Sequence, residues 1–143
     1  MGIAFRRARP GDAPHLLGLV EQLGYSSSLE DLRARLELVL AREDHAIFVA
    51  EEEGALLGWI HVLAFDSLAT ERCALVGGLV VDESRRRSGI GRKLVTLVED
   101  WVRARGLSVL RLRSQEARSS AHRFYERLGF RLVKHQLQFK KEL

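Results

Sequence analysis

Residues 79–91 read Leu-Val-Val-Asp-Glu-Ser-Arg-Arg-Arg-Ser-Gly-Ile-Gly and join an apolar run to a helical pattern. The apolar run, residues 73–81, is long and uncharged, which is typical of a strand covered on both faces. After it, apolar residues recur at intervals of three and four from 91 to 105, and Gly106 stands where the helix should end. A buried strand that leads through glycines into a helix directs backbone N–H groups and the positive helix end at one point. The segment therefore predicts an anion-binding site.

Two common phosphate-binding loops do not fit this segment. The P-loop pattern G-x-x-x-x-G-K-[ST] occurs nowhere in the chain, and the dinucleotide pattern G-x-G-x-x-G fails because Leu94 stands at its third glycine. Glycine suits positions 89 and 91 because a side chain would keep a diphosphate away from the amides, and the neighbouring arginines add charge. The alternative is a solvated basic turn that happens to contain glycines.

The rest of the chain alternates between helical and strand-like periods. Residues 46–50 and 56–65 are β-rich and flank a Glu-Glu-Glu-Gly turn, so we expect them to pair antiparallel. Helices are expected after Asp12 and after Ser28, which suit N-cap positions. Further strands are expected at 3–7 and 107–112, a helix at 119–128, and one bent strand or two at 130–139.

Two motifs resemble those of a known family. Residues 86–91 fit R-x-x-G-x-G and resemble the acyl-CoA signature of the GNAT superfamily of N-acyltransferases. Residues 121–130, Ala-His-Arg-Phe-Tyr-Glu-Arg-Leu-Gly-Phe, lie further along the chain and are similar to the family's A-x-x-F-Y-E-x-L-G-F segment. The resemblance covers the whole chain. It implies a single α/β (α+β) domain over residues 1–143, with about four helices and a mixed, mostly antiparallel sheet of six or seven strands.

The resemblance also implies a reaction and a site. Acetyl-CoA is the expected co-substrate, and a primary amine attacks its thioester directly, with no covalent enzyme intermediate. The pantetheine arm is expected to pair with the edge of the strand before the signature, as a peptide extends a sheet. Arg86 is expected to clamp the diphosphate, and the Tyr125 hydroxyl is the expected catalytic group near the thioester sulfur. The cofactor-binding residues are then Leu79, Val80, Val81, Arg86, Arg87, Ser88, Gly89, Ile90, Gly91, Arg92 and Ser119.

The sequence departs from the family pattern at three places. Glu83 stands where many relatives have Pro, and Arg87 stands where many have Gly. An Asn that contacts the cofactor is common near position 118, where this chain has none. Gln115, Ser119 or Ser120 could replace it, and Ser119 is our candidate.

The sequence does not single out a general base. The run 73–81 contains no acid, and Glu21, Asp66, Glu71 or a water chain could each remove the proton. His61 and Phe65 alternate with Trp59 on one strand face and are candidates for the acceptor side. His122 lies one helical turn before Tyr125, but an exposed helix histidine is the simpler interpretation. No histidine has ligand spacing to another or to Cys73, so no metal site is expected.

Composition places limits on the class of protein. The chain has 143 residues, 46% hydrophobic and 29% charged, which favours one soluble domain. One cysteine excludes an internal disulfide framework, no apolar run reaches the ~18 residues of a membrane span, and no signal peptide is recognised. We therefore expect a cytoplasmic protein without membrane contact.

Charge and the C-terminal sequence bear on partners. The net charge is +4, and residues 82–93 contain no aromatic side chain, so the basic cluster fits a compact phosphate ligand better than nucleic acid. The alternative to an enzyme is a non-catalytic acyl-CoA-binding or nucleic-acid-contacting module. Many members of the family that the chain resembles pair through their C-terminal strands, and residues 136–139 form an edge with few charges, so a homodimer is expected. The identity of the acceptor amine is not encoded in any pattern that we recognise.

Overall fold

A computed structural model describes residues 2–115 and 118–143. The chain forms two compact units, one up to Arg113 and one from Ser114 onward. The first unit holds a β-sheet and three α-helices, and the second holds one α-helix followed by an extended tail among the residues that are described.

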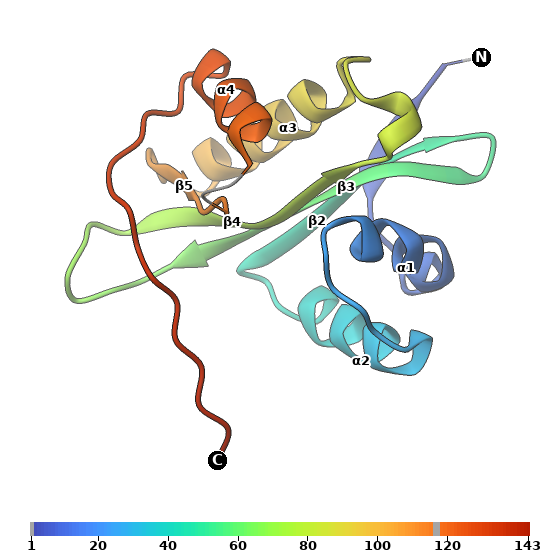
Figure 1. Cartoon of the computed structure of the whole chain (residues 1–143), viewed down its shortest axis with the longest axis horizontal. Coiled ribbons are helices and arrows are strands. Elements are labelled where there is room, and N and C mark those ends of the chain that lie inside the picture. Colours follow the sequence, from blue (N-terminus) through green and yellow to red (C-terminus); the bar gives the residue numbers. More distant parts are fainter. Residues whose placement is uncertain (1, 116–117) are drawn as a thin grey trace. The chain divides into compact units, whose positions relative to one another are not determined.

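The sheet of the first unit has the strand order β1-β2-β3-β4-β5. The first four strands are antiparallel neighbours, whereas β5 runs parallel to β4. Helices α1 and α2 cover one face of the sheet and α3 covers the other (Figure 1). The strands are β1 (Ala4–Arg7), β2 (His45–Glu52), β3 (Ala55–Phe65), β4 (Cys73–Val81) and β5 (Leu110–Leu112), and the helices are α1 (Ala13–Gln22), α2 (Leu29–Leu40) and α3 (Ile90–Ala104), with short 3-10 turns η1 (Pro10–Asp12) and η2 (Glu83–Arg85).

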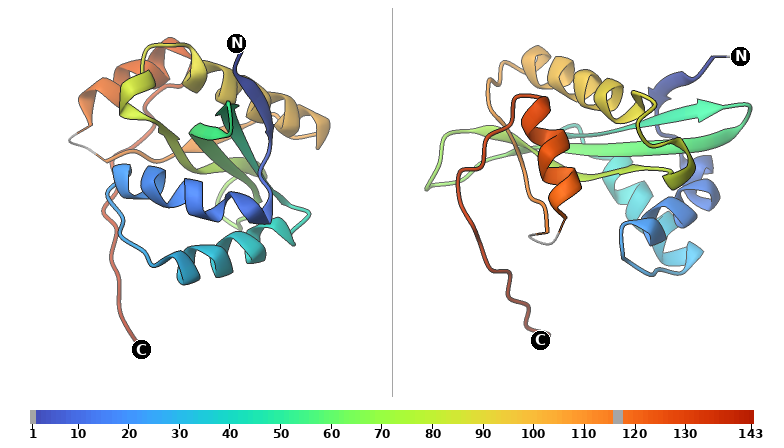
Figure 2. Two further views of the ribbon diagram at one scale, coloured as in Figure 1. Left: turned by 90° about the vertical axis from the view of Figure 1, so that its right-hand side faces the viewer. Right: turned by 45° about the horizontal axis from the view of Figure 1, so that its top comes forward.

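Local sequence explains where the helices begin and which face they bury. The Ser28 side chain accepts a hydrogen bond from the Asp31 backbone N–H at 3.1 Å, which caps α2 as expected. Helix α3 buries one stripe of aliphatic residues, including Leu94 and Val98, which are fully buried. Figure 2 shows the sheet between α3 and the α1–α2 pair.

Alternation along β3 divides the core between the two faces of the sheet. Ile60 and Val62 are completely buried, and they share a face with Gly58, where an added Cβ would lie 3.5 Å from the Ile90 side chain of α3. Trp59 belongs to the opposite face, where it packs with the cluster that α1 and α2 complete. His61 follows Trp59 on that face.

The second unit contains α4 (Ser119–Arg127), and the residues after Gly129 form neither helix nor strand. The expectation of strand structure at 130–139 is therefore wrong. The described residues form a sheet of five strands, not the six or seven that we expected. The fold class is the expected mixed α/β class. The alternation in this segment does not mark a buried face, because its apolar side chains are exposed: Leu132, Val133, Leu137 and Phe139.

Candidate functional site

The fourth strand has an open edge over half of its length. On one side, β3 pairs with β4 from Cys73 to Val81. On the other side, β5 pairs only with Ala74, Leu75 and Val76. Among the residues described, no strand continues this pairing, so residues 77–81 present main-chain groups that a ligand could use. This edge includes Leu79, Val80 and Val81, the residues expected to meet pantetheine.

A β-bulge marks the point where the edge opens. His61 pairs with Gly78 and Val62 pairs with Val76, so Gly77 is the extra residue. Gly77 is exposed. A Cβ atom at position 77 would lie 2.6 Å from His61 Nδ1, and one at Gly78 would lie 2.5 Å from the Trp59 ring. Only glycine fits at these two positions. A Gly-Gly pair inside a strand is a sequence signal for a bulge, and our sequence analysis did not use it.

A short loop leads from β4 to α3 and has unusual backbone geometry. Asp82 accepts hydrogen bonds at one carboxylate oxygen, 3.0 Å from both the backbone N–H and the hydroxyl of Ser84. Arg87 has φ +65° and Gly89 has φ +88°, both in the left-handed region. This conformation explains why glycine is frequent at the position that Arg87 occupies here. The Ser88 hydroxyl donates to the Arg85 carbonyl and closes the loop.

The loop ends at helical N–H groups that have no partner within the helix. The first hydrogen bond of α3 joins the Lys93 N–H to the Gly89 carbonyl at 3.0 Å. The N–H groups of Ile90, Gly91 and Arg92 therefore precede the first intrahelical donor. No atom lies within 4 Å of the position that a Gly89 Cβ would take, so the space beside this glycine is open. This helix start can bind an anion.

The basic side chains of the loop divide into two groups. Arg85 forms an ion pair with Glu52 at 2.7 Å, and the Lys93 ammonium lies 6.0 Å from the centre of the Phe5 ring. Arg86 donates from Nε to the Val81 carbonyl at 3.3 Å, at the end of the open edge. Arg87 and Arg92 are exposed, and within the described part of the chain neither forms an ion pair. These two cations, together with the Arg86 guanidinium, which bonds to the protein only through Nε, are available to a phosphate.

Tyr125 and Ser119 belong to α4 in the second unit, whereas residues 79–92 lie together in the first unit. The Tyr125 ring makes edge contacts with Phe124 and Phe130, at centroid distances of 5.5 and 6.0 Å. Burial raises the pKa of Tyr125, and the charge of Arg118 opposes this rise in pKa. The phenol therefore carries its proton at neutral pH. Ser119 is the first residue of α4.

Comparison with known proteins identifies the family. Residues 17–130 match the family model described as the acetyltransferase (GNAT) family. The chain belongs to this family. The expectation of a GNAT acetyltransferase enzyme is thereby confirmed.

Relatives of this GNAT chain include N-acetyltransferases. It is 29% identical over 132 residues to an aminoglycoside N(6')-acetyltransferase type 1 of Serratia marcescens, covering 89% of this chain and 90% of that one. It is 26% identical over 130 residues to the uncharacterized N-acetyltransferase YhfO of Bacillus subtilis, covering 87% of each chain. Its fold matches AAC(6')-Iy in complex with a bisubstrate analogue, CoA-S-monomethyl-acetylneamine, with a TM-score of 0.87, 19% identity and full coverage of both chains.

Two of the three acids considered as general base in this GNAT chain are occupied. Asp66 pairs with Arg72 at 2.9 Å, and Glu71 pairs with Arg111 at 3.0 Å. Backbone hydrogen bonding and then the Arg111 charge lower the pKa of Glu71. Both carboxylates are therefore engaged in surface ion pairs, and neither is singled out as a general base.

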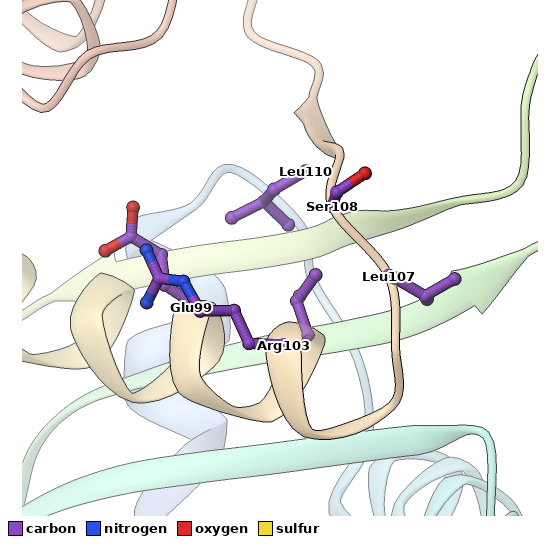
Figure 3. Close-up of a pocket in the computed structure, with 6 residues that line it drawn as sticks. Glu99, Arg103, Leu107, Ser108 and Leu110 are labelled. Carbon is purple, nitrogen blue, oxygen red and sulfur yellow. The ribbon is translucent and has the colours of Figure 1, made fainter.

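The described residues contain neither a metal-binding group nor a membrane-spanning helix, and a pocket that they form lies away from the site. Residues 2–115 and 118–143 contain no group of three or more His, Cys, Asp or Glu placed to hold a metal ion. Likewise, none of the helices in these ranges has the length and hydropathy needed to cross a bilayer. A pocket between α3 and β5 (Figure 3) lies along the second half of α3, away from the anion-binding helix start. Its lining residues are Glu99, Val102, Arg103, Leu107, Ser108 and Leu110.

Proposed function

We propose that this chain transfers the acetyl group of acetyl-CoA to a primary amine by direct attack in a ternary complex. The observation that carries the proposal is one continuous track in the first unit. The open edge of β4 at residues 77–81 leads directly into the glycine loop and the N-terminus of α3. This track offers amide pairing at one end and an anion site at the other, which suits a ligand with an amide-bearing arm and a diphosphate.

Each part of the track has a chemical role in the proposal. Leu79, Val80 and Val81 pair with the pantetheine amides. The amides at Gly89, Gly91 and their neighbours hold the diphosphate, with Arg86, Arg87 and Arg92 supplying charge. The Tyr125 hydroxyl donates a proton to the departing thiolate. Ser119 contacts the cofactor in place of the usual Asn.

The names of the relatives support an amine acceptor. One relative is an aminoglycoside acetyltransferase, and a structural neighbour was solved with an analogue that joins CoA to an acetylated neamine. Another relative, 36% identical over 107 residues, is a mycothiol acetyltransferase of Thermobispora bispora. Free-CoA release should therefore be measured against a panel of aminoglycosides, small cationic amines and N-terminal peptides.

The anion site is tested by Gly91→Val. A valine side chain at the helix start blocks close approach to the amides, so acetyl-CoA binding measured by calorimetry should be lost while the protein stays folded. Gly18→Val is the matched control, because Gly18 is an exposed glycine in α1 with open space beside it. Unchanged acetyl-CoA affinity in Gly91→Val would overturn the assignment of the site. Acetyl-CoA binding without turnover on the whole panel would favour a non-catalytic acyl-CoA module.

A further inference from the structure

Two histidines contact each other on the face of the sheet that α1 and α2 cover. His45 begins β2 and His61 lies in the middle of β3. Nδ1 of His45 lies 2.9 Å from Nε2 of His61, and the rings stack with centroids 5.1 Å apart. One of these two nitrogens carries the hydrogen and the other accepts it. The contact therefore fixes the orientation of both rings.

The other nitrogen of His61 faces the β-bulge. His61 Nδ1 would be 2.6 Å from a Cβ at position 77, so it lies directly against Gly77. Gly77 is exposed and is the first residue of β4 beyond its pairing with β5. His61 Nδ1 is therefore held at the end of the open edge that is farther from the anion-binding loop. Leu79, Val80 and Val81 lie between this nitrogen and the loop. Bulges are frequent beside active sites because they redirect strand groups.

The surroundings keep this nitrogen unprotonated. Burial, followed by the neighbouring His45, lowers the pKa of His61 to about 4. Burial also lowers the pKa of His45, against the effect of Asp44, whose Oδ1 lies 3.9 Å from His45 Nε2. Arg42 donates two hydrogen bonds of 3.0 Å to the Asp44 carboxylate and so stabilises its ionised form. Asp44 and Arg42 are the charged groups that act on the pair, which is neutral at pH 7.

We propose that His61 is a catalytic residue that accepts the proton of the attacking amine, and that His45 is the positioning residue that passes this proton toward Asp44 and solvent. The inference rests on the proposed function, and it supplies the base that the surface acids do not. It follows from the contact of His61 Nδ1 with the bulge at Gly77 and of His61 Nε2 with His45.

The proton balance of the step is simple. The amine nitrogen bonds to the thioester carbon and the carbon–sulfur bond breaks. The nitrogen gives one proton to His61 Nδ1, His61 Nε2 gives one to His45 Nδ1, and His45 Nε2 gives one to water beside Asp44. The sulfur takes a proton from Tyr125, which solvent restores. The amine becomes more acidic as its bond to carbon forms, so a weak base such as His61 suffices.

The first test measures the tautomer in the wild-type protein. Nitrogen-15 NMR of the histidine rings at pH 7 should show His61 protonated at Nε2 and bare at Nδ1, with the His61 signals shifting on addition of acetyl-CoA and those of His15 unchanged. In His45→Gln the pKa of His61 should rise above its wild-type value of about 4, because the smaller of its two causes is removed, and it should stay below the ordinary histidine value, because burial remains. A hydrogen on Nδ1 of wild-type His61 would overturn the proposal whether or not any variant folds.

The second test uses kinetics with the best amine of the panel. His61→Gln should lower kcat by roughly 10²-fold or more, with the Kd for acetyl-CoA within a few-fold of wild type, and exposed His15→Gln should match wild type. His61→Gly should regain activity in proportion to added imidazole, and only to its neutral form as pH is varied. Wild-type rates in His61→Gln would overturn the role of His61 and leave the proposed function intact. A wild-type enzyme that acetylates no amine would overturn the proposed function itself.

Discussion

Tyr125 is the residue that we propose as proton donor. Its raised pKa keeps the hydroxyl protonated, while CoA leaves as the thiolate of a thiol with a pKa of ~8.5. We predict that Tyr125→Phe lowers kcat well beyond tenfold, because a positioned acid contributes roughly 10²–10⁴-fold, and leaves the Kd for acetyl-CoA within a few-fold. Steady-state kinetics and calorimetry measure both quantities.

The exposed Tyr25 provides the control for this change. Tyr25→Phe removes the same hydroxyl from a solvated position and should alter neither quantity. An unchanged kcat in Tyr125→Phe would mean that Tyr125 only packs between its phenylalanine neighbours, and that water or the acidity of the thiol completes the reaction.

At the level of the elements, one charge network joins the start of the chain to the sheet. Arg6 of β1 makes two hydrogen bonds of 2.9 Å to Asp12, at the end of η1, and further bonds to Glu51 of β2. Asp12 also accepts from the Arg9 N–H at 2.8 Å and is buried. We predict that Asp12→Asn lowers the free energy of unfolding by about 2 kcal/mol, because it removes the carboxylate that makes the two shortest bonds to Arg6 and leaves Glu51 to balance the Arg6 charge.

The pH dependence of this loss follows from the sign of the pKa shift. The hydrogen bonds from Arg6 lower the pKa of Asp12 in the folded state below its ordinary value of 3.8. The stabilisation is therefore complete above 3.8, the value in the unfolded chain, and is lost as pH falls from there through the lower pKa of the folded state. Urea unfolding at pH 7 and at pH 3 should show a smaller difference between wild type and variant at pH 3. The exposed pair of Asp100 and Arg103 supplies the control, since Asp100→Asn should change little at either pH.

Elements that depend on near neighbours in sequence were predictable, and features that depend on strand register were not. The helical spacing after Gly91 and the cap at Ser28 are local signals, and both helices form as predicted. The bulge at Gly77 depends on which residue of β3 faces which residue of β4, and no periodicity encodes that match. The contact between His45 and His61 arises in the same way, so the sequence suggested His61 only as an acceptor-side candidate.

At the scale of the whole molecule, the tail after α4 carries the prediction of a homodimer. Leu137 and Phe139 are 82% and 87% exposed, an unusual state for two large apolar side chains so close in sequence. We predict a dimer of twice the chain mass of 16.2 kDa in sedimentation at micromolar concentration, with Phe139→Lys shifting it toward monomer. Leu68→Lys, which changes an exposed leucine between β3 and β4, should leave the mass unchanged. A wild-type species at the monomer mass alone would contradict the prediction.

The open edge of β4 also has a consequence for how the protein behaves in concentrated solution. An unpaired strand edge is the part of a sheet at which separate chains aggregate, and residues 77–81 contain no charged side chain to prevent this. In the first unit that edge is the same one along which the proposed ligand lies. Acyl-CoA would therefore act as a solubilising cover as well as a substrate, and a cell depleted of it would leave this enzyme prone to aggregation.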